Sequence, residues 1–259
     1  MPTKKFIEHM AKGQWVSATE LLQQDSLLAH GRYTYDHVYG VESQPTSIFA
    51  IHQAVACHAP VTFIEALIKA YPKGVHKEDT AFHRVPLHIA CRNKSSKETI
   101  ELLLEYGEEA AAHQDNLGRI PLHYALSHGA SVDLVMSLLM ASPNSTCATD
   151  KAGWTPLHVA CNQGSPFSVI EALVREDPKS VIYKTDSNGS TALTLATKCT
   201  SSPDKENILN LLQKKESEMV DKTEYVRIRD AEEKAASLKQ KDRLTVRKCS
   251  KRDSVRAVI

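Results

Sequence analysis

The sequence predicts an all-α solenoid of stacked helix-turn-helix units joined by hairpin-like turns. The first observation is a motif, Pro-Leu-His-x-Ala, that begins at Pro86, Pro121 and Pro156 and so recurs every 35 residues. The second is a degenerate copy on each side, at Ala50 and Ala192, each 36 residues away. The third is an apolar helical stripe after each copy. Five copies at a nearly constant period indicate a repeat array rather than one globular core.

Each copy of the motif has the residues of a helix start. Thr155 can cap the free backbone N–H groups of the helix that follows it. Pro156 loses nothing at the first helical position, because its N–H would have had no partner there. Leu and Ala then recur on one face at helical spacing, and the small Ala lets the next helix approach closely. We therefore expect a first helix to begin at each motif.

The stretch Thr155–Ala160, together with the preceding Asp150–Trp154, resembles the signature of the ankyrin repeat. The resemblance covers roughly residues 4–212, so the expected fold is an ankyrin-repeat solenoid. The tetratricopeptide repeat has a similar period, but its Trp, Gly and Tyr pattern is missing.

Four histidines occupy the same motif position, at 52, 88, 123 and 158. The resemblance implies that each His hydrogen-bonds the motif Thr and the backbone of the neighbouring loop. Because Val85 and Ile120 replace the Thr, His88 and His123 are expected to bond backbone groups instead. Packed helices would separate neighbouring histidines by roughly 10 Å, which exceeds the reach of one metal ion.

The second helix of each unit is expected from its apolar stripe and its stop signal. Each stripe is centred on two adjacent aliphatic residues. The helices are expected to end at Pro72, Gly107, Pro143 and Pro178. Turns are expected next, where an Asp bonds its own turn backbone and a Gly takes the positive-φ corner. These turns begin at Asp115, Asp150 and Asp186; the turn at Asp79 departs, with His83 in place of Gly and one extra residue.

The expected organisation has three parts. Residues 1–46 are an N-terminal capping helix pair, with helices at 5–11 and 15–24, and a long loop from Gly31 to Thr46 that carries three tyrosines. That loop is either a flexible insertion or a finger with aromatic contacts. Residues 47–212 hold the repeats, divided as 47–82, 83–117, 118–152, 153–188 and 189–212. Residues 213–259 form a charged tail, helical over 223–240 and flexible after it.

Charge is distributed unevenly along the chain. The tail holds 14 Lys and Arg against 9 Asp and Glu, a net charge of +5, whereas the chain as a whole has +1. Basic residues between Arg243 and Arg256 could serve nuclear import or bind anionic lipid or nucleic acid. The simpler interpretation is a solvated tail, so a nucleic-acid- or membrane-associated adaptor is kept as the alternative function.

Other function classes find no support in the sequence. No apolar run is long enough to span a membrane, and the N-terminus lacks the apolar core of a signal peptide. No phosphate-binding Gly-rich loop, HExxH motif or nucleophile elbow occurs. The six cysteines lack metal-site spacing and fit reduced thiols, as in a cytoplasmic or nuclear protein. We expect no enzyme, no cofactor, no metal and no small-molecule substrate.

The predicted function is a non-catalytic scaffold that binds a protein partner through the turn tips and the exposed ends of the first helices. Trp154 is expected to be mostly exposed, because the matching positions hold Arg84, Arg119 and Ser190 and an unpaired buried Arg is costly. Leu117 and Trp154 either face water or pack on the adjacent loop. The full predicted set is Arg84, Arg92, Asn93, Asn116, Leu117, Arg119, Ser127, His128, Lys151, Ala152, Trp154, Asn162, Gln163, Ser187, Asn188 and Ser190.

Overall fold

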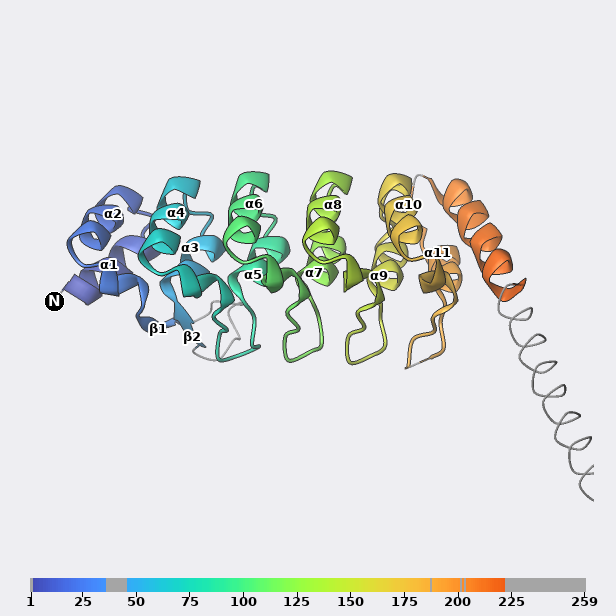
Figure 1. Ribbon diagram of the computed structural model, residues 1–259, viewed down its shortest axis with the longest axis horizontal. Coiled ribbons are helices and arrows are strands. Elements are labelled where there is room, and N and C mark those ends of the chain that lie inside the picture. Colours follow the sequence, from blue (N-terminus) through green and yellow to red (C-terminus); the bar gives the residue numbers. More distant parts are fainter. Residues whose placement is uncertain (1, 36–45, 187, 201, 203, 222–259) are drawn as a thin grey trace, which may run out of the picture. The chain divides into compact units, whose positions relative to one another are not determined.

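The computed structural model describes residues 2–35, 46–186, 188–200, 202 and 204–221. The chain divides into two compact units, residues 1–213 and 214–259. The first unit is an array of helix pairs, and Figure 1 shows the pairs side by side with their turns along one edge. This arrangement confirms the predicted all-α solenoid.

Each pair consists of a first helix and a second helix, and from α3 on the first helix is the shorter one. The first helices are α1 (Pro2–Ala11), α3 (Ala50–Ala56), α5 (Pro86–Arg92), α7 (Pro121–Ser127), α9 (Pro156–Gln163) and α11 (Ala192–Lys198). The second helices are α2 (Trp15–Gln24), α4 (Val61–Ala70), α6 (Lys97–Tyr106), α8 (Val132–Ala141) and α10 (Phe167–Glu176). From α3 to α11 the first helices begin at the predicted motifs, whereas α1, for which no motif was found, begins at Pro2.

The core lies between successive pairs, because each helix packs on its counterpart in the next pair. Leu87, Leu122 and Leu157 of the motif are each 1% exposed or less. The second helices bury their stripes in the same way, for example Ile100 and Leu103 of α6. Burial between neighbours is what a solenoid needs in place of one central core.

A 3-10 turn follows each second helix, which sequence patterns did not predict. These turns are η1 (Ser26–Ala29), η2 (Pro72–His76), η3 (Glu108–Ala112), η4 (Pro143–Cys147) and η5 (Pro178–Ile182). Three of them begin at a Pro that stops the preceding helix, as expected.

The loop from Gly31 to Thr46 starts and ends in a two-stranded antiparallel ladder. Strand β1 (Arg32–Tyr35) pairs with β2 (Thr46–Phe49), with Tyr33 opposite Ile48. Tyr33 is 7% exposed, and its hydroxyl donates a hydrogen bond to the Leu28 carbonyl over 2.6 Å. The ends of the segment are therefore built into the array, whereas residues 36–45, with Tyr39 and Pro45, lie outside the described residues.

The first pair has the two helices predicted for it. Phe6 and Met10 of α1 are fully buried, and Leu22 of α2 is 4% exposed. The Trp15 ring lies 5.3 Å from that of Phe63 in α4, so the pair packs directly on its neighbour.

Residues 205–221 are helical, and this helix continues past residue 213. Within the first unit it buries Ile208 and Leu212, at 2% and 0% exposure. The helix predicted for 223–240 and the basic residues 243–256 lie outside the described residues. In the part of the chain that the structure describes, no helix has the length and apolar character needed to cross a membrane.

Candidate binding surface

The turns that precede α7 and α9 are held by an aspartate. Asp115 Oδ1 accepts hydrogen bonds from the N–H groups of Leu117 (2.8 Å) and Arg119 (2.9 Å). Asp150 Oδ1 does the same for Ala152 (2.9 Å) and Trp154 (3.0 Å). The turns therefore present their tips in a fixed conformation.

Glycine is required at the corner of these turns. Gly153 has φ +74, and a Cβ there would come within 2.6 Å of the Asp186 backbone nitrogen in the next turn. Successive turns therefore approach each other too closely for a side chain at this corner. The corner residue must also adopt the left-handed conformation, which costs Gly little.

Backbone hydrogen bonds join each turn to the next. Four of these bonds run between neighbouring tips: Thr80 N–H to Ser47 (3.2 Å), Asn116 N–H to Phe82 (2.8 Å), Lys151 N–H to Leu117 (2.9 Å) and Asp186 N–H to Ala152 (3.1 Å). The tips form one continuous row, visible along the lower edge of Figure 1.

The turn before α5 (residues 79–84, the second turn) and the turn before α11 (residues 185–190, the fifth turn) are built differently from the turns before α7 and α9. His83 has φ +56 where the others have Gly, and Asp79 Oδ1 accepts from Phe82 N–H over 2.6 Å. In the fifth turn Thr185, and not the predicted Asp186, takes the place of Asp115 and Asp150. Thr185 N–H donates to the Ser190 carbonyl, and its Oγ1 accepts from Ser190 N–H over 3.1 Å. Because that turn has one extra residue, the residue that holds it lies one position before the predicted Asp186.

Arg84 does not lie on the exposed surface, so its expected exposure is wrong. Only 6% exposed, it places Nε 3.3 Å from Asp115 Oδ2 and donates from Nη2 to the Tyr124 hydroxyl over 2.7 Å. Its guanidinium also lies 4.2 Å from the ring centre of Phe82 and 4.8 Å from that of Tyr124. A buried Arg is tolerated here because it is paired and stacked.

Asp115 is the centre of this buried group. Its Oδ2 also accepts a hydrogen bond from Tyr124 over 2.6 Å. Burial alone would raise the pKa of Asp115, but bonds from Tyr124, Arg119 and Leu117 outweigh it and hold this pKa below its ordinary value. The carboxylate is therefore charged at neutral pH and can pair with Arg84.

The other three residues at this repeat position differ in exposure. Arg119 places Nε 3.3 Å from Asp150 Oδ2 and keeps a side chain 42% exposed. Trp154 is half-buried, with its ring 6.3 Å from that of His158, so the expectation that it is mostly exposed is wrong. Ser190 is 6% exposed and is also misplaced on the predicted surface.

The rest of the predicted set divides by exposure. Exposed side chains are those of Asn116, Leu117, Lys151, Ala152, Asn162, Gln163 and Asn188. The half-buried ones are Arg92, Asn93, Ser127 and His128, and Ser187 lies outside the described residues. Three of the half-buried side chains bond backbone carbonyls: Asn93 to Ala56 (3.3 Å), Ser127 to His123 (2.8 Å) and His128 to Tyr124 (2.8 Å).

Sequence patterns missed two tip residues in the second turn, Thr80 and Phe82. Thr80 is exposed, and its Oγ1 accepts from Ser47 N–H over 3.0 Å. The spacing of five residues from Asp79 to Arg84, against four from Asp115 to Arg119, was the signal that could have located them.

Three motif histidines link their repeat to the next. Nε2 donates to a backbone carbonyl of the following repeat from His52 to Arg84 (3.1 Å), from His88 to Arg119 (2.9 Å) and from His123 to Trp154 (2.9 Å). His158 instead donates to the Tyr183 carbonyl of its own repeat (3.0 Å). Nδ1 of His88 and His123 accepts from the N–H of Val85 and Ile120, as predicted. His158 Nδ1 also bonds the Thr155 hydroxyl over 2.8 Å.

Burial keeps these histidines neutral. Loss of solvent lowers the pKa of His52 and of His88 to about 4 and also lowers the pKa values of His123 and His158. Across the described ranges, no three His, Cys, Asp or Glu side chains are grouped so that they could hold a metal ion. The four histidines thus have structural roles, and His52, His88 and His123 link neighbouring repeats.

Comparison with known proteins places these features in a family. No curated protein matches the chain. The family model for ankyrin repeats (3 copies) matches residues 51–147 and 128–223, which together span most of the chain. With the repeated turn, the helix pair and the histidine link all present, the chain belongs to the ankyrin repeat family.

Proposed function

We propose that this chain is a non-catalytic scaffold that binds a protein partner through its turn tips and the exposed ends of its first helices. Ankyrin repeats generally mediate protein–protein binding, and the family is typically non-catalytic. The proposal adds which surface of this chain binds the partner, and it includes a cytoplasmic or nuclear location.

The observation that carries the proposal is a row of exposed side chains on turns whose backbone is held by hydrogen bonds, both within each turn and from the neighbouring turn. Asn116, Leu117 and Lys151 point from tips whose N–H groups are taken up by Asp115, Asp150 or the neighbouring turn. Leu117 is 40% exposed although it is apolar. A rigid surface loses little conformational entropy on binding, which favours affinity.

A pull-down from cell extract followed by mass spectrometry tests the proposal. Leu117→Asp should lose partners that the unmodified chain retains, because it places a charge at the centre of the tip row. Met140→Asp is the matched control, since Met140 is 74% exposed on the second helix α8 and lies outside the proposed surface. Equal partner sets for the two variants would contradict the proposal.

A further inference from the structure

Strand β1 has one paired edge and one open edge. Strand β2 pairs with it on one side, and the turn that holds Thr80 follows on the far side of β2. Among the described residues, no backbone hydrogen bond reaches Arg32 or Thr34 from outside the β1–β2 ladder, and both residues are exposed. The open edge of β1 is therefore accessible to another chain.

The hydrogen bonds of Ser47 show which groups this edge presents. Ser47 N–H donates to Thr80 Oγ1 over 3.0 Å, and its carbonyl accepts from Thr80 N–H over 3.2 Å. Both groups of Ser47 point away from β1, so Ser47 and Thr34, which lie opposite each other, form a non-hydrogen-bonded pair. Thr34 then directs its own N–H and carbonyl away from β2, and Arg32, two residues earlier, does the same.

The charged side chain of this strand does not protect the open edge. Natural proteins often place a charge on an edge strand, which keeps other strands away. Here the Arg32 guanidinium lies 4.9 Å from the ring centre of Phe49 on β2, and Nη2 donates to the Glu78 carbonyl over 3.3 Å. The side chain therefore extends across β2 toward the second turn and leaves the open edge uncovered.

The strand is held in place before anything pairs with it. The buried Tyr33 ring lies 6.3 Å from that of Phe6 in α1, and its hydroxyl is bonded to the Leu28 carbonyl. An edge that is already ordered loses little conformational entropy when a second strand joins it.

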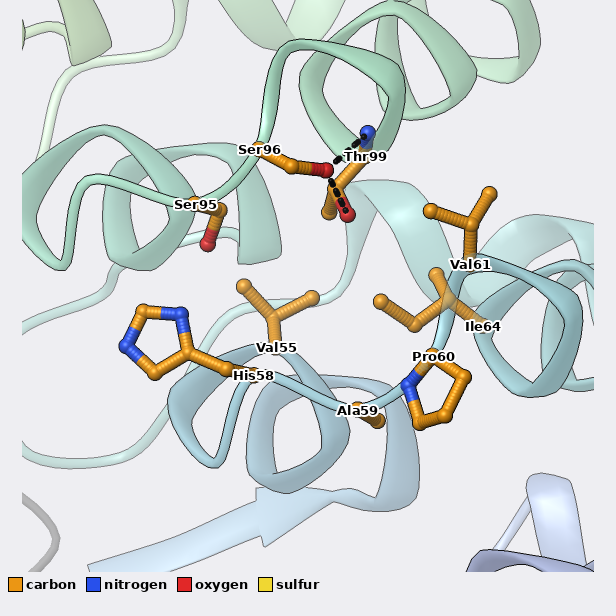
Figure 2. A pocket seen from close by; sticks show the side chains of 9 residues that line it. All are labelled: Val55, His58, Ala59, Pro60, Val61, Ile64, Ser95, Ser96 and Thr99. Atoms are coloured by element: carbon orange, nitrogen blue, oxygen red, sulfur yellow. Dashed lines mark hydrogen bonds between the residues drawn. The ribbon is translucent and has the colours of Figure 1, made fainter.

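An open strand edge specifies its occupant more closely than a hollow does. The hollow of about 200 Å³ between the α3–α4 and α5–α6 loops (Figure 2) is lined by no Lys, Arg, Asp or Glu, so it selects no particular partner. The outward N–H and carbonyl groups of Arg32 and Thr34, in contrast, are complementary to the same groups of an extended polypeptide.

We propose that an extended segment of a protein partner pairs with β1 and adds a strand beside Arg32 and Thr34. A second copy of this chain is a poorer occupant, because the edge has four residues and a stable protein–protein interface buries about 1,200 Å² or more. A single added strand needs only this edge. The contact lies outside the tip residues assigned above, so the inference goes beyond the proposed function.

Amide NMR of the full chain, titrated with acetyl-Thr-Val-Thr-Val-Thr-amide, tests this inference. The peptide is rich in β-branched residues, which favour strands. The Arg32 and Thr34 N–H signals should shift, and solvent exchange of the Thr34 amide should slow about tenfold at about ten times the dissociation constant. The same peptide with every backbone nitrogen methylated has no donors and should shift neither signal. No shift with the unmethylated peptide at millimolar concentration, or equal shifts with both peptides, would overturn the inference.

Thr34→Pro separates the edge from the fold. Proline removes an N–H that the β1–β2 ladder does not use, so the melting temperature should fall by no more than about 3 °C. Binding of the peptide should weaken at least about tenfold, since the ring occupies the place of the donor. Thr34→Val keeps the N–H and should bind as the unmodified chain does. Full binding by Thr34→Pro, or unfolding of that variant, would contradict the edge described here.

Failure here can be told from failure of the proposed function. Leu117→Asp should bind the peptide normally, because it changes the tip row and leaves β1 intact. In the pull-down, loss of partners by Leu117→Asp with full retention by Thr34→Pro would leave the proposed function standing and overturn this inference. Light scattering identifies the other occupant: a dimer of the unmodified chain that Thr34→Pro dissociates would show that a second copy pairs with β1, and would also overturn it.

Discussion

At the scale of single residues, burial of charge is decided by partners and not by residue type. Arg84 and Arg119 occupy the same repeat position, yet one is buried and the other half-exposed. The difference lies in what surrounds them: Arg84 lies 4.2 Å from the Phe82 ring centre and 4.8 Å from that of Tyr124, whereas Arg119 lies 6.0 Å from that of Tyr124. The variety of residues at one repeat position therefore does not show that the position is exposed, because a residue such as Arg84 can be buried when all its polar groups have partners.

Replacing Arg84 should therefore be costly. Arg84→Ala leaves Asp115 buried without its cation, and removal of one partner from a buried pair costs about 3–5 kcal/mol. Lys151→Ala, at an exposed tip, should change stability by less than about 0.5 kcal/mol. Urea unfolding of both variants checks the contrast. Comparable small losses would mean that Arg84 contributes no more than a surface charge.

The motif histidines predict how stability depends on pH. Folding holds His52 and His88 at a pKa of about 4, against 6.5 in the unfolded chain. Below pH 6.5 the unfolded chain binds protons that the folded chain does not, so stability falls as pH drops from 6.5 to 4. Each should contribute a loss of up to roughly 3 kcal/mol over this window.

Urea unfolding at several pH values between 7.5 and 4.5 measures this loss. His88→Gln should reduce the number of protons taken up on unfolding by about one, so that the free energy of unfolding depends less steeply on pH. It should also lower stability at pH 7. His9→Gln, at a half-buried surface position of α1, serves as the control. An unchanged slope in His88→Gln would show that other groups cause the acid sensitivity.

At the scale of elements, the sequence predicted those whose signals are local. The motif prolines located the first helices, and Pro72, Pro143 and Pro178 located the ends of the second helices, because Pro acts on its own backbone. The β1–β2 ladder pairs strands on either side of residues 36–45, and Arg84 pairs with Asp115, 31 residues further along the chain, so the pattern within a single element revealed neither.

A helix in the middle of the array should matter more than one near its end. Leu122 of α7 is 1% exposed, whereas Leu193 of α11 is half-buried. Leu122→Ala should cost about 2–5 kcal/mol through lost contacts and the cavity left behind, and Leu193→Ala should cost less. Denaturant melts of the two variants measure the difference. Equal or reversed losses would contradict coupling through neighbours.

At the scale of the whole molecule, the first unit needs a cover for its last repeat. Ile208 and Leu212 supply one, because both are buried, and the Asp204 carboxylate accepts a hydrogen bond from Phe167 N–H over 3.2 Å. An uncovered final layer would expose apolar surface to water, which repeat arrays avoid with capping elements.

Truncation separates this cover from the residues beyond it. A chain ending at Gln213 keeps Ile208 and Leu212 and should unfold with nearly unchanged cooperativity and midpoint. A chain ending at Thr200 loses both and should melt at a clearly lower temperature, since burying one such side chain is worth about 1.5–3 kcal/mol. Circular dichroism melts compare the two. A large drop for the chain ending at Gln213 would show that the fold extends beyond residue 213.

The histidine bonds described above give the array a direction. Three of the four run from a repeat to the repeat that follows, and the fourth, from His158, ends at Tyr183 within its own repeat. The last copy of the motif replaces the histidine with Thr194. Thr194 uses its hydroxyl locally, donating to the Thr191 carbonyl over 2.8 Å and accepting from Thr191 N–H over 2.9 Å. The last repeat therefore provides no histidine bond to a further repeat. A duplicated repeat inserted between α7 and α9 would receive such a bond from the repeat before it. A repeat added after α11 would receive none, because Thr194 stands in place of the histidine.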